Sequence, residues 1–212
     1  MKVERLEPQK NRNKRFNLYA DGNFICGLSA DTVTEFGITE GIEIPDTRLQ
    51  EIKRFDDYLY AKKISFDLLA YRKRSVSELE RKLRSRKFSD DVISDVISHL
   101  KELNLLDDTT FSEDYVREMV RKNMGRKYIF SRLIEKGIAR EVADEVIDRV
   151  FRSVDEKELA MKIFSKYSSR IKSGNIQEQK RKVYDHLVRK GFDNEVIISV
   201  INEKLASEVR SE

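Results

Sequence analysis

The feature that most constrains this chain is an internal repeat that runs through most of its length. Three segments share one apolar template anchored at Phe88, Ile138 and Phe192, with spacings of 50 residues (88 to 138) and 54 residues (138 to 192). An aliphatic residue lies nine residues before each anchor and a leucine five before, a valine lies four after, and a Val-Ile pair lies eight and nine after. These positions are Leu79, Leu83, Val92, Val96 and Ile97 in the first segment, Ile129, Leu133, Val142, Val146 and Ile147 in the second, and Val183, Leu187, Val196, Val200 and Ile201 in the third. Agreement at six positions in three segments predicts tandem structural units that bury their apolar faces within themselves and on their neighbours.

The template predicts two helices joined by a tight turn, because apolar positions four residues apart share one helix face. Gly137 and Gly191 precede their anchors and suit a helix C-terminus in the left-handed conformation, whereas Lys87 has to accept some strain or a different cap there. Ser89 and Asp193 are candidate N-caps for the second helix of the pair. A further helix is expected before each pair, at about residues 56–73, 110–122 and 155–172. Capping boxes are expected at Ser75…Glu78, Thr110…Glu113, Ser153…Glu156 and Asn175…Glu178.

The region before the repeats has a different pattern. Short alternating segments near residues 3–6, 16–18 and 24–28 predict strands, with a hairpin turn at Asp21-Gly22-Asn23. One or two helical turns are expected over residues 30–36, closed by Gly37. The expected fold class is therefore mainly α, with three tandem three-helix repeats in an elongated, curved array that follows a small β-hairpin module. The expected domains are the module at 1–54 and the repeats at 55–107, 108–152 and 153–212.

Charge alternates along the repeats, although the net charge is only +4 and the isoelectric point lies near 9.0. Basic stretches at residues 62–87 (ten cations, three acids), 117–140 (eight and two) and 157–191 (ten and three) alternate with acidic stretches at 89–114 (one and eight), 141–156 (two and six) and 193–212 (two and five). In each repeat the first two helices are thus basic and the third is acidic. If the repeats stack in register, the molecule gains a basic face suited to a polyanion or an acidic protein groove. The alternative is that these charges only keep the helices soluble.

The sequence offers little catalytic material. His99 and His186 are expected at surface or boundary positions on helices, and the single cysteine, Cys26, is expected to pack in the hairpin. Asp107-Asp108 precedes a helix, where capping explains the pair better than metal binding does. No metal-ligand spacing or phosphate-binding glycine loop is present, so a binding protein without catalytic activity, metal or cofactor is expected. One cysteine, a charged N-terminus and the lack of an apolar run long enough to span a bilayer favour a cytoplasmic protein that does not bind membranes.

Several runs together resemble the RecX family of RecA regulators over about residues 58–205. The run Tyr71-Arg72-Lys73-Arg74-Ser75-Val76-Ser77-Glu78-Leu79 resembles a signature of the first repeat. Leu105-Leu106-Asp107-Asp108 followed by Phe111 resembles the motif that opens the second. Gly125, Ile129, Leu133 and Lys136-Gly137-Ile138 resemble the motif that follows it, and Lys190-Gly191-Phe192 repeats its end. Tyr128 and Lys87 depart from the residues common in the family.

The resemblance implies a regulator that lies in the helical groove of the RecA–DNA filament, contacts more than one protomer, and inhibits ATP hydrolysis and strand exchange. We expect the protein to be a monomer. Weak, salt-dependent DNA binding is also expected, because the basic helices offer phosphate contacts but few base-reading groups. Two alternatives remain open: a general nucleic-acid-binding helical protein, and a helical-repeat adaptor for another acidic protein. The candidate partner-binding residues on the basic face are Arg72, Arg74, Arg81, Lys82, Arg84, Arg117, Arg121, Lys122, Arg126, Lys127 and Arg132.

Overall fold

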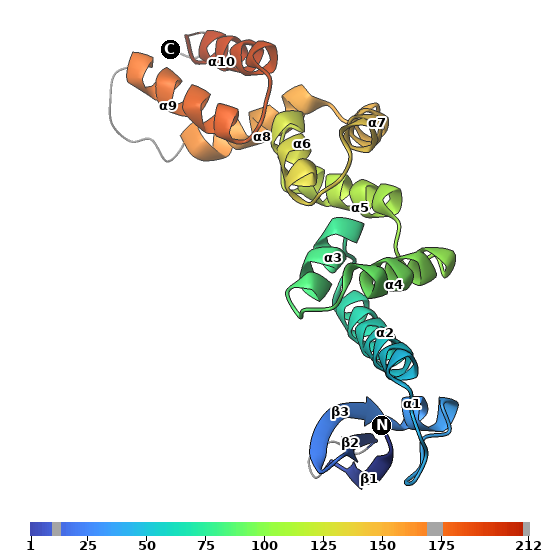
Figure 1. Ribbon diagram of the computed structural model, residues 1–212. Helices are drawn as coiled ribbons and strands as arrows, with labels where there is room; N and C mark the ends of the chain where they lie inside the picture. Colours follow the sequence, from blue (N-terminus) through green and yellow to red (C-terminus); the bar gives the residue numbers. More distant parts are fainter. Residues whose placement is uncertain (10–13, 169–175, 210–212) are drawn as a thin grey trace. The chain divides into compact units, whose positions relative to one another are not determined.

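The computed structural model describes residues 1–9, 14–168 and 176–209 (Figure 1). The chain separates into two compact units. The first unit contains residues 1–72 and 79–105, and the second contains residues 73–78 and 106–212. Three-helix repeats follow a small antiparallel sheet along the chain, so the predicted mainly α class with tandem three-helix repeats after a small β module is confirmed.

The first unit begins with the predicted β module. Strands β1 (Val3–Pro8), β2 (Arg15–Ala20) and β3 (Asn23–Ser29) form an antiparallel sheet in the order β1-β2-β3. Asp21 and Gly22 both have positive φ, 51° and 72°, as a type I′ hairpin turn requires. Helix α1 (Ala30–Glu35) follows, and Gly37 with φ 59° lies just beyond its end, as expected. Apolar residues of the sheet and the following loop form a core with Ile52 of the next helix, and Cys26 packs against this core.

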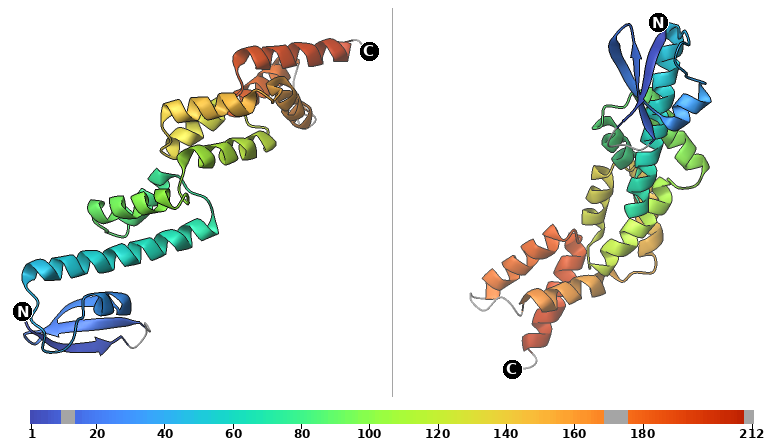
Figure 2. Two further views of the ribbon diagram at one scale, coloured as in Figure 1. Left: turned by 90° about the vertical axis from the view of Figure 1, so that its right-hand side faces the viewer. Right: turned by 90° about the horizontal axis from the view of Figure 1, so that it is seen from below.

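Helix α2 (Asp46–Tyr71) begins ten residues earlier than the helix expected at residue 56. Pro45 is its N-cap in an extended conformation, and Asp46 places a carboxylate in the first turn, where the helix dipole favours it. The helix is uninterrupted and lies beside the sheet (Figure 2). Its first half buries Ile52 in the module core, while Ala61 and Ile64 are buried further along. The expected boundary between residues 54 and 55 therefore falls inside a continuous helix.

The remaining helices follow the repeat template. The first repeat continues with α3 (Val76–Arg84) and α4 (Asp90–Glu102). The second contains α5 (Asp108–Arg121), α6 (Arg126–Glu135) and α7 (Arg140–Phe151), and the third contains α8 (Glu156–Ser168), α9 (Ile176–Arg189) and α10 (Asn194–Val209). The leucines five residues before the anchors, Leu83, Leu133 and Leu187, are all fully buried. The Val-Ile pairs eight and nine residues after the anchors are buried too, so the predicted register is confirmed.

The helix starts differ from the predicted capping boxes at two places. The side chain of Asp107, not Thr110, caps α5 and accepts a 2.7 Å hydrogen bond from the Thr110 N–H. Asp155, not Ser153, accepts from the Glu158 N–H at the start of α8. Asp107 and Asp155 each lie immediately before the first residue of their helix, whereas Thr110 lies within the first turn of α5 and Ser153 lies further before α8. The aspartate charge also suits the helix N-terminus. The Ser75 hydroxyl does accept from the Glu78 N–H, as predicted, and Asn175 lies outside the described residues.

Two equivalent junctions join successive repeats within the second unit. The Gly125 N–H at the start of α6 donates to Lys190 O at 2.9 Å, and the Lys127 N–H donates to Gly191 O at 3.0 Å. The Arg126 N–H also donates to the carboxylate of Glu156 at the start of α8. The second helix of one repeat therefore begins directly against the glycine turn and the first helix of the next.

Segment 73–78 makes the same kind of junction with the second repeat. The Ser75 hydroxyl donates to Lys136 O at 2.6 Å, next to Gly137. The Val76 N–H donates to Asp108 at the start of α5, in the role that Arg126 and Glu156 have at the other junction. The contacts between neighbouring three-helix units therefore recur along the chain, as the cores within the units do.

Candidate functional site

The eleven candidate partner-binding residues divide between the two units. Arg72, Arg81, Lys82 and Arg84 belong to the first unit, and Arg74 and the six residues from Arg117 to Arg132 belong to the second. Nine of them are exposed, while Arg74 and Arg126 are half-buried. The second-repeat cations lie on α5, at its C-terminal end, and on α6. A single continuous basic face across all the repeats stays a prediction.

Many of these cations have local acidic partners. Arg84 pairs with Asp90 at 3.0 Å, Lys122 with Glu118 at 2.5 Å, and Arg132 with Glu135 at 2.5 Å. All these side chains are largely exposed, and pairs of this kind contribute only about 0–1 kcal/mol. Such cations can exchange their local partner for a carboxylate or phosphate on a binding partner at small cost.

Arg126 differs from the other candidates, because its contacts connect repeats. Its guanidinium lies 2.6 Å from Asp148 and 3.5 Å from Glu156, and it stacks 4.7 Å from the centroid of the Phe151 ring. Burial raises the pKa of Glu156, while the hydrogen bond from the Arg126 N–H and the Arg126 charge act against that rise. These contacts favour a structural role for Arg126 at the junction over a role in partner binding.

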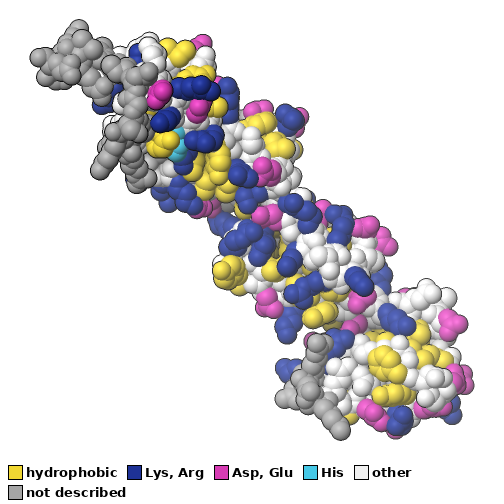
Figure 3. All heavy atoms as spheres, turned by 90° about the vertical axis from the view of Figure 1, so that its left-hand side faces the viewer, with side chains coloured by type: hydrophobic (Ala, Val, Ile, Leu, Met, Phe, Trp, Pro, Cys, Tyr) yellow, Lys and Arg dark blue, Asp and Glu magenta, His cyan; other side chains and the backbone are white. Residues whose placement is uncertain are grey.

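Ion pairs also connect the first and third helices inside each repeat. Arg54 of α2 pairs with Asp95 of α4, Glu113 of α5 pairs with Arg149 of α7, and Lys157 of α8 pairs with Glu203 of α10. Part of the charge that alternates along the sequence is therefore neutralised between packed helices. Figure 3 shows Lys and Arg side chains over much of the visible face, interspersed with acidic and apolar side chains.

Sequence reasoning missed a groove on the second unit that is rimmed by three arginines. Arg117 and Arg121 of α5 line it together with Arg149 of α7, and its volume is about 400 Å³. Arg149 was not among the candidates because it lies on a helix whose sequence is mostly acidic. Its place at the groove follows from the packing of α5 against α7. This packing sets Arg149 beside Glu113, which lies one helical turn before Arg117 on α5.

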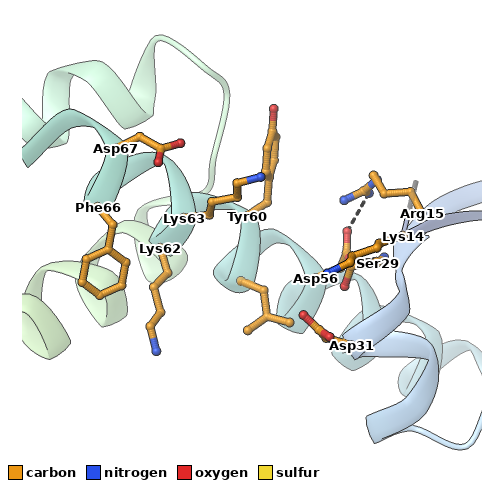
Figure 4. Close-up of a pocket in the computed structure, with 11 residues that line it drawn as sticks. Lys14, Arg15, Ser29, Asp31, Asp56, Tyr60, Lys62, Lys63, Phe66 and Asp67 are labelled. Atoms are coloured by element: carbon orange, nitrogen blue, oxygen red, sulfur yellow. Dashed lines mark hydrogen bonds and ion pairs between the residues drawn. The ribbon is translucent and has the colours of Figure 1, made fainter. Parts of the chain in front are cut away.

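A second cleft, of about 770 Å³, lies in the first unit between the sheet, α1 and α2 (Figure 4). Its buried end is held by Asp56, which accepts hydrogen bonds from Arg15 at 2.8 Å, the Ser29 N–H at 2.6 Å and the Thr32 hydroxyl at 2.8 Å. Four cations and three carboxylates line the cleft, so its charge is nearly balanced. Because the Asp56 network joins β2, β3 and α1 to α2, we assign it to fastening the module onto the long helix.

The two histidines lie at boundary positions, as expected. His99 and His186 are both half-buried on helices, and the His186 ring stacks on Tyr167 with a centroid distance of 4.0 Å. Burial lowers the pKa of His186, with further lowering from Lys190 and Arg189. Among the described residues, no group of three or more His, Cys, Asp or Glu side chains is arranged to hold a metal ion. In the described part of the chain, no helix is both long and apolar enough to cross a membrane.

These features define a class, namely a helical-repeat protein that carries many exposed arginines and lysines. Models of four RecX domains match the chain in order. The N-terminal domain of regulatory protein RecX matches residues 1–45, and its first, second and third three-helix domains match residues 61–100, 107–147 and 155–201. The chain belongs to the RecX family.

Individual relatives agree with this assignment. The chain is 30% identical over 203 residues to regulatory protein RecX of Staphylococcus aureus strain Newman, which covers 95% of this chain and 74% of that protein. A crystal structure of regulatory protein RecX is similar with a TM-score of 0.69 and 26% identity, covering 95% of this chain and 98% of the other. The crystal structure of RecX from Lactobacillus salivarius is similar with a TM-score of 0.62 and 29% identity, covering 70% and 96%.

Proposed function

We propose that this protein regulates the RecA recombinase by binding the RecA–DNA filament, in its helical groove, and lowering ATP hydrolysis and strand exchange. The observation that carries the proposal is the ordered match of all four RecX domains to one chain. The exposed cations of α3, α5 and α6 support it, since the groove of a protein–DNA filament contains DNA phosphate as well as protein. In this proposal the protein acts as a cytoplasmic monomer, without a cofactor and away from membranes.

Multivalent contact explains how weak individual contacts can suffice. An exposed ion pair contributes little by itself, but contacts presented by several repeats of one chain reinforce one another through their high effective concentration. Binding across more than one RecA protomer would also hold neighbouring protomers in one arrangement. Protomers held in this way would undergo more slowly the conformational changes that accompany ATP hydrolysis.

The alternative of general nucleic-acid binding makes a different prediction about the ligand. Few aromatic side chains are exposed on the described part of the repeats, so stacking on bases is not favoured and DNA contact would be mainly with phosphate. Such binding falls steeply as salt rises, because it depends on counterion release.

Co-sedimentation with preformed RecA filaments, compared with binding to bare single-stranded DNA, separates these functions. We expect filament binding to persist at about 150 mM salt, where binding to bare DNA becomes weak. Equal affinity for filament and bare DNA over a salt series would support the nucleic-acid alternative. Absence of binding to both would favour an adaptor for another acidic protein.

A further inference from the structure

The arginine-rimmed groove of the second unit combines two chemistries that point to one kind of ligand. Its floor is formed by Val120, Val150 and Val154, all half-buried. These valines pack against the cores of the second and third repeats and still line the groove. The guanidinium groups of Arg117, Arg121 and Arg149 surround this apolar floor, and all three arginines are exposed.

Two of the three arginines are held in place. Glu113 accepts from Arg149 at 2.7 Å through one carboxylate oxygen and from Arg117 at 3.4 Å through the other. A single carboxylate therefore orients two guanidinium groups, which lowers the entropy lost when they bind a ligand. Arg121 makes no ion pair with any residue that the structure describes. Around the rim, the three positive charges are opposed by Glu113 and by the exposed Glu145, which lies 4.0 Å from Arg149.

An arginine rim above an aliphatic floor suits a protein segment better than a nucleic acid. Guanidinium groups bind carboxylates with paired, charge-assisted hydrogen bonds, and the valines can take up an aliphatic side chain from the same segment. A sugar-phosphate backbone would leave the valine floor uncovered, and none of the described residues that line the groove offers an aromatic ring for a base to stack on. A volume of about 400 Å³ accommodates a few side chains.

We propose that this groove binds a short acidic segment of the partner protein, with an Asp or Glu carboxylate on the arginine rim and an adjacent aliphatic side chain on the valine floor. The inference rests on the proposed function, because it names the part of the second unit that contacts RecA protein and not its DNA. Hot spots of protein interfaces commonly have this form, with an arginine beside a desolvated apolar contact.

Two variants and one matched control test the proposal by titration against RecA filaments and against bare single-stranded DNA. Arg121→Glu reverses the charge of the arginine that has no described ion pair, and Val150→Thr makes the floor polar with little change in shape. Arg152→Glu makes the same charge change at an exposed position on the end of α7 that does not line the groove. Circular dichroism and urea unfolding verify that all three proteins fold like the wild type.

We expect Arg121→Glu to weaken filament binding about tenfold or more, and Arg152→Glu to weaken it less than about threefold. Val150→Thr should weaken filament binding several-fold and leave DNA binding unchanged, since it alters no charge. Equal losses for Arg121→Glu and Arg152→Glu, with no effect of Val150→Thr, would overturn the groove while the proposed function stands. Loss of DNA binding in both groove variants would assign the groove to phosphate instead. If wild type binds no filament, the proposed function fails and the inference fails with it.

Discussion

At the residue scale, the glycines of the repeat turns serve a purpose that the turn conformation alone does not explain. Lys87, Gly137 and Gly191 hold the same place in the three repeats, and all have positive φ, at 67°, 81° and 86°. Lys87 shows that the turn can form without glycine. A Cβ atom on Gly191 would lie 2.2 Å from the Tyr128 backbone nitrogen, and one on Gly137 would lie 2.3 Å from Ser77 Cβ. Glycine is therefore required where another repeat's helix begins against the turn.

Alanine substitutions can separate the effect of conformation from that of close approach. Gly41 also has positive φ, 87°, but a Cβ atom there would meet nothing within 4 Å. Gly41→Ala should therefore cost only the left-handed conformation, about 1–2 kcal/mol. Gly191→Ala adds a clash with backbone and should cost about 2–4 kcal/mol in total. Urea unfolding of both variants provides the comparison, and equal losses would show that the junction adapts to the extra atom.

His186 gives the third repeat a defined pH dependence. Its pKa is lowered in the folded chain by burial and by two nearby cations, so the unfolded chain binds a proton at higher pH than the folded chain does. Stability from this group is fully present above the ordinary histidine pKa of about 6.5 and is lost as pH falls below it. His186→Phe keeps a ring to stack on Tyr167 and removes the titration.

Thermal unfolding of wild type and His186→Phe between about pH 7.5 and 5.5 measures this difference. We expect the variant to lose less stability than the wild type as pH falls. Parallel curves for the two proteins would show that His186 has the same pKa in both states.

At the element scale, periodicity predicted the helices well and predicted their ends less well. The template at four-residue and nine-residue spacings placed α3, α4, α6 and α7 and the cores between them, because burial is strongly patterned along a helix. It missed the buried position five after each anchor, which holds Ile93, Ala143 and Ile197; Ala143 and Ile197 are buried more fully than the valines before them. Periodicity did not predict the early start of α2. The first half of this helix packs against the sheet, where Ile52 belongs to the module core, so its apolar residues do not follow the repeat template.

Leu133 tests the register of the second repeat. It is fully buried in a core that includes Ile129, Ile138 and Val146. Leu133→Ala should lower the free energy of unfolding by about 2–5 kcal/mol, through lost burial and the cavity left behind. Ser131→Ala, at an exposed position of the same helix, should change it by no more than about 0.5 kcal/mol. The comparison is made by urea unfolding, and a similar small loss for both variants would mean that the core is not formed around Leu133.

At the scale of the whole molecule, the sequence predicted the surface chemistry better than the site geometry. The alternation of basic and acidic stretches was visible in the sequence, and the exposed cations of α3, α5 and α6 agree with it. The sequence could not show that Glu113 joins Arg117 to Arg149, or that Arg126 is used between repeats, because these contacts arise from packing of distant segments. The elongated, curved array of repeats stays a prediction.

The most direct test of the proposed function is the rate of ATP hydrolysis by preformed RecA–DNA filaments as this protein is added. A variant in which Arg81, Lys82, Arg121 and Arg132 are changed to Glu is titrated beside the wild type. A control in which Asp90, Asp91, Asp95 and Glu102 are changed to Lys accompanies them. All eight positions are exposed. We predict that the wild type and the control lower the rate in a dose-dependent way, and that the basic-residue variant does so only weakly. Inhibition by the basic-residue variant but not by the control would mean that the acidic helices make the contact, and no effect of the wild type on hydrolysis would contradict RecA regulation by this chain.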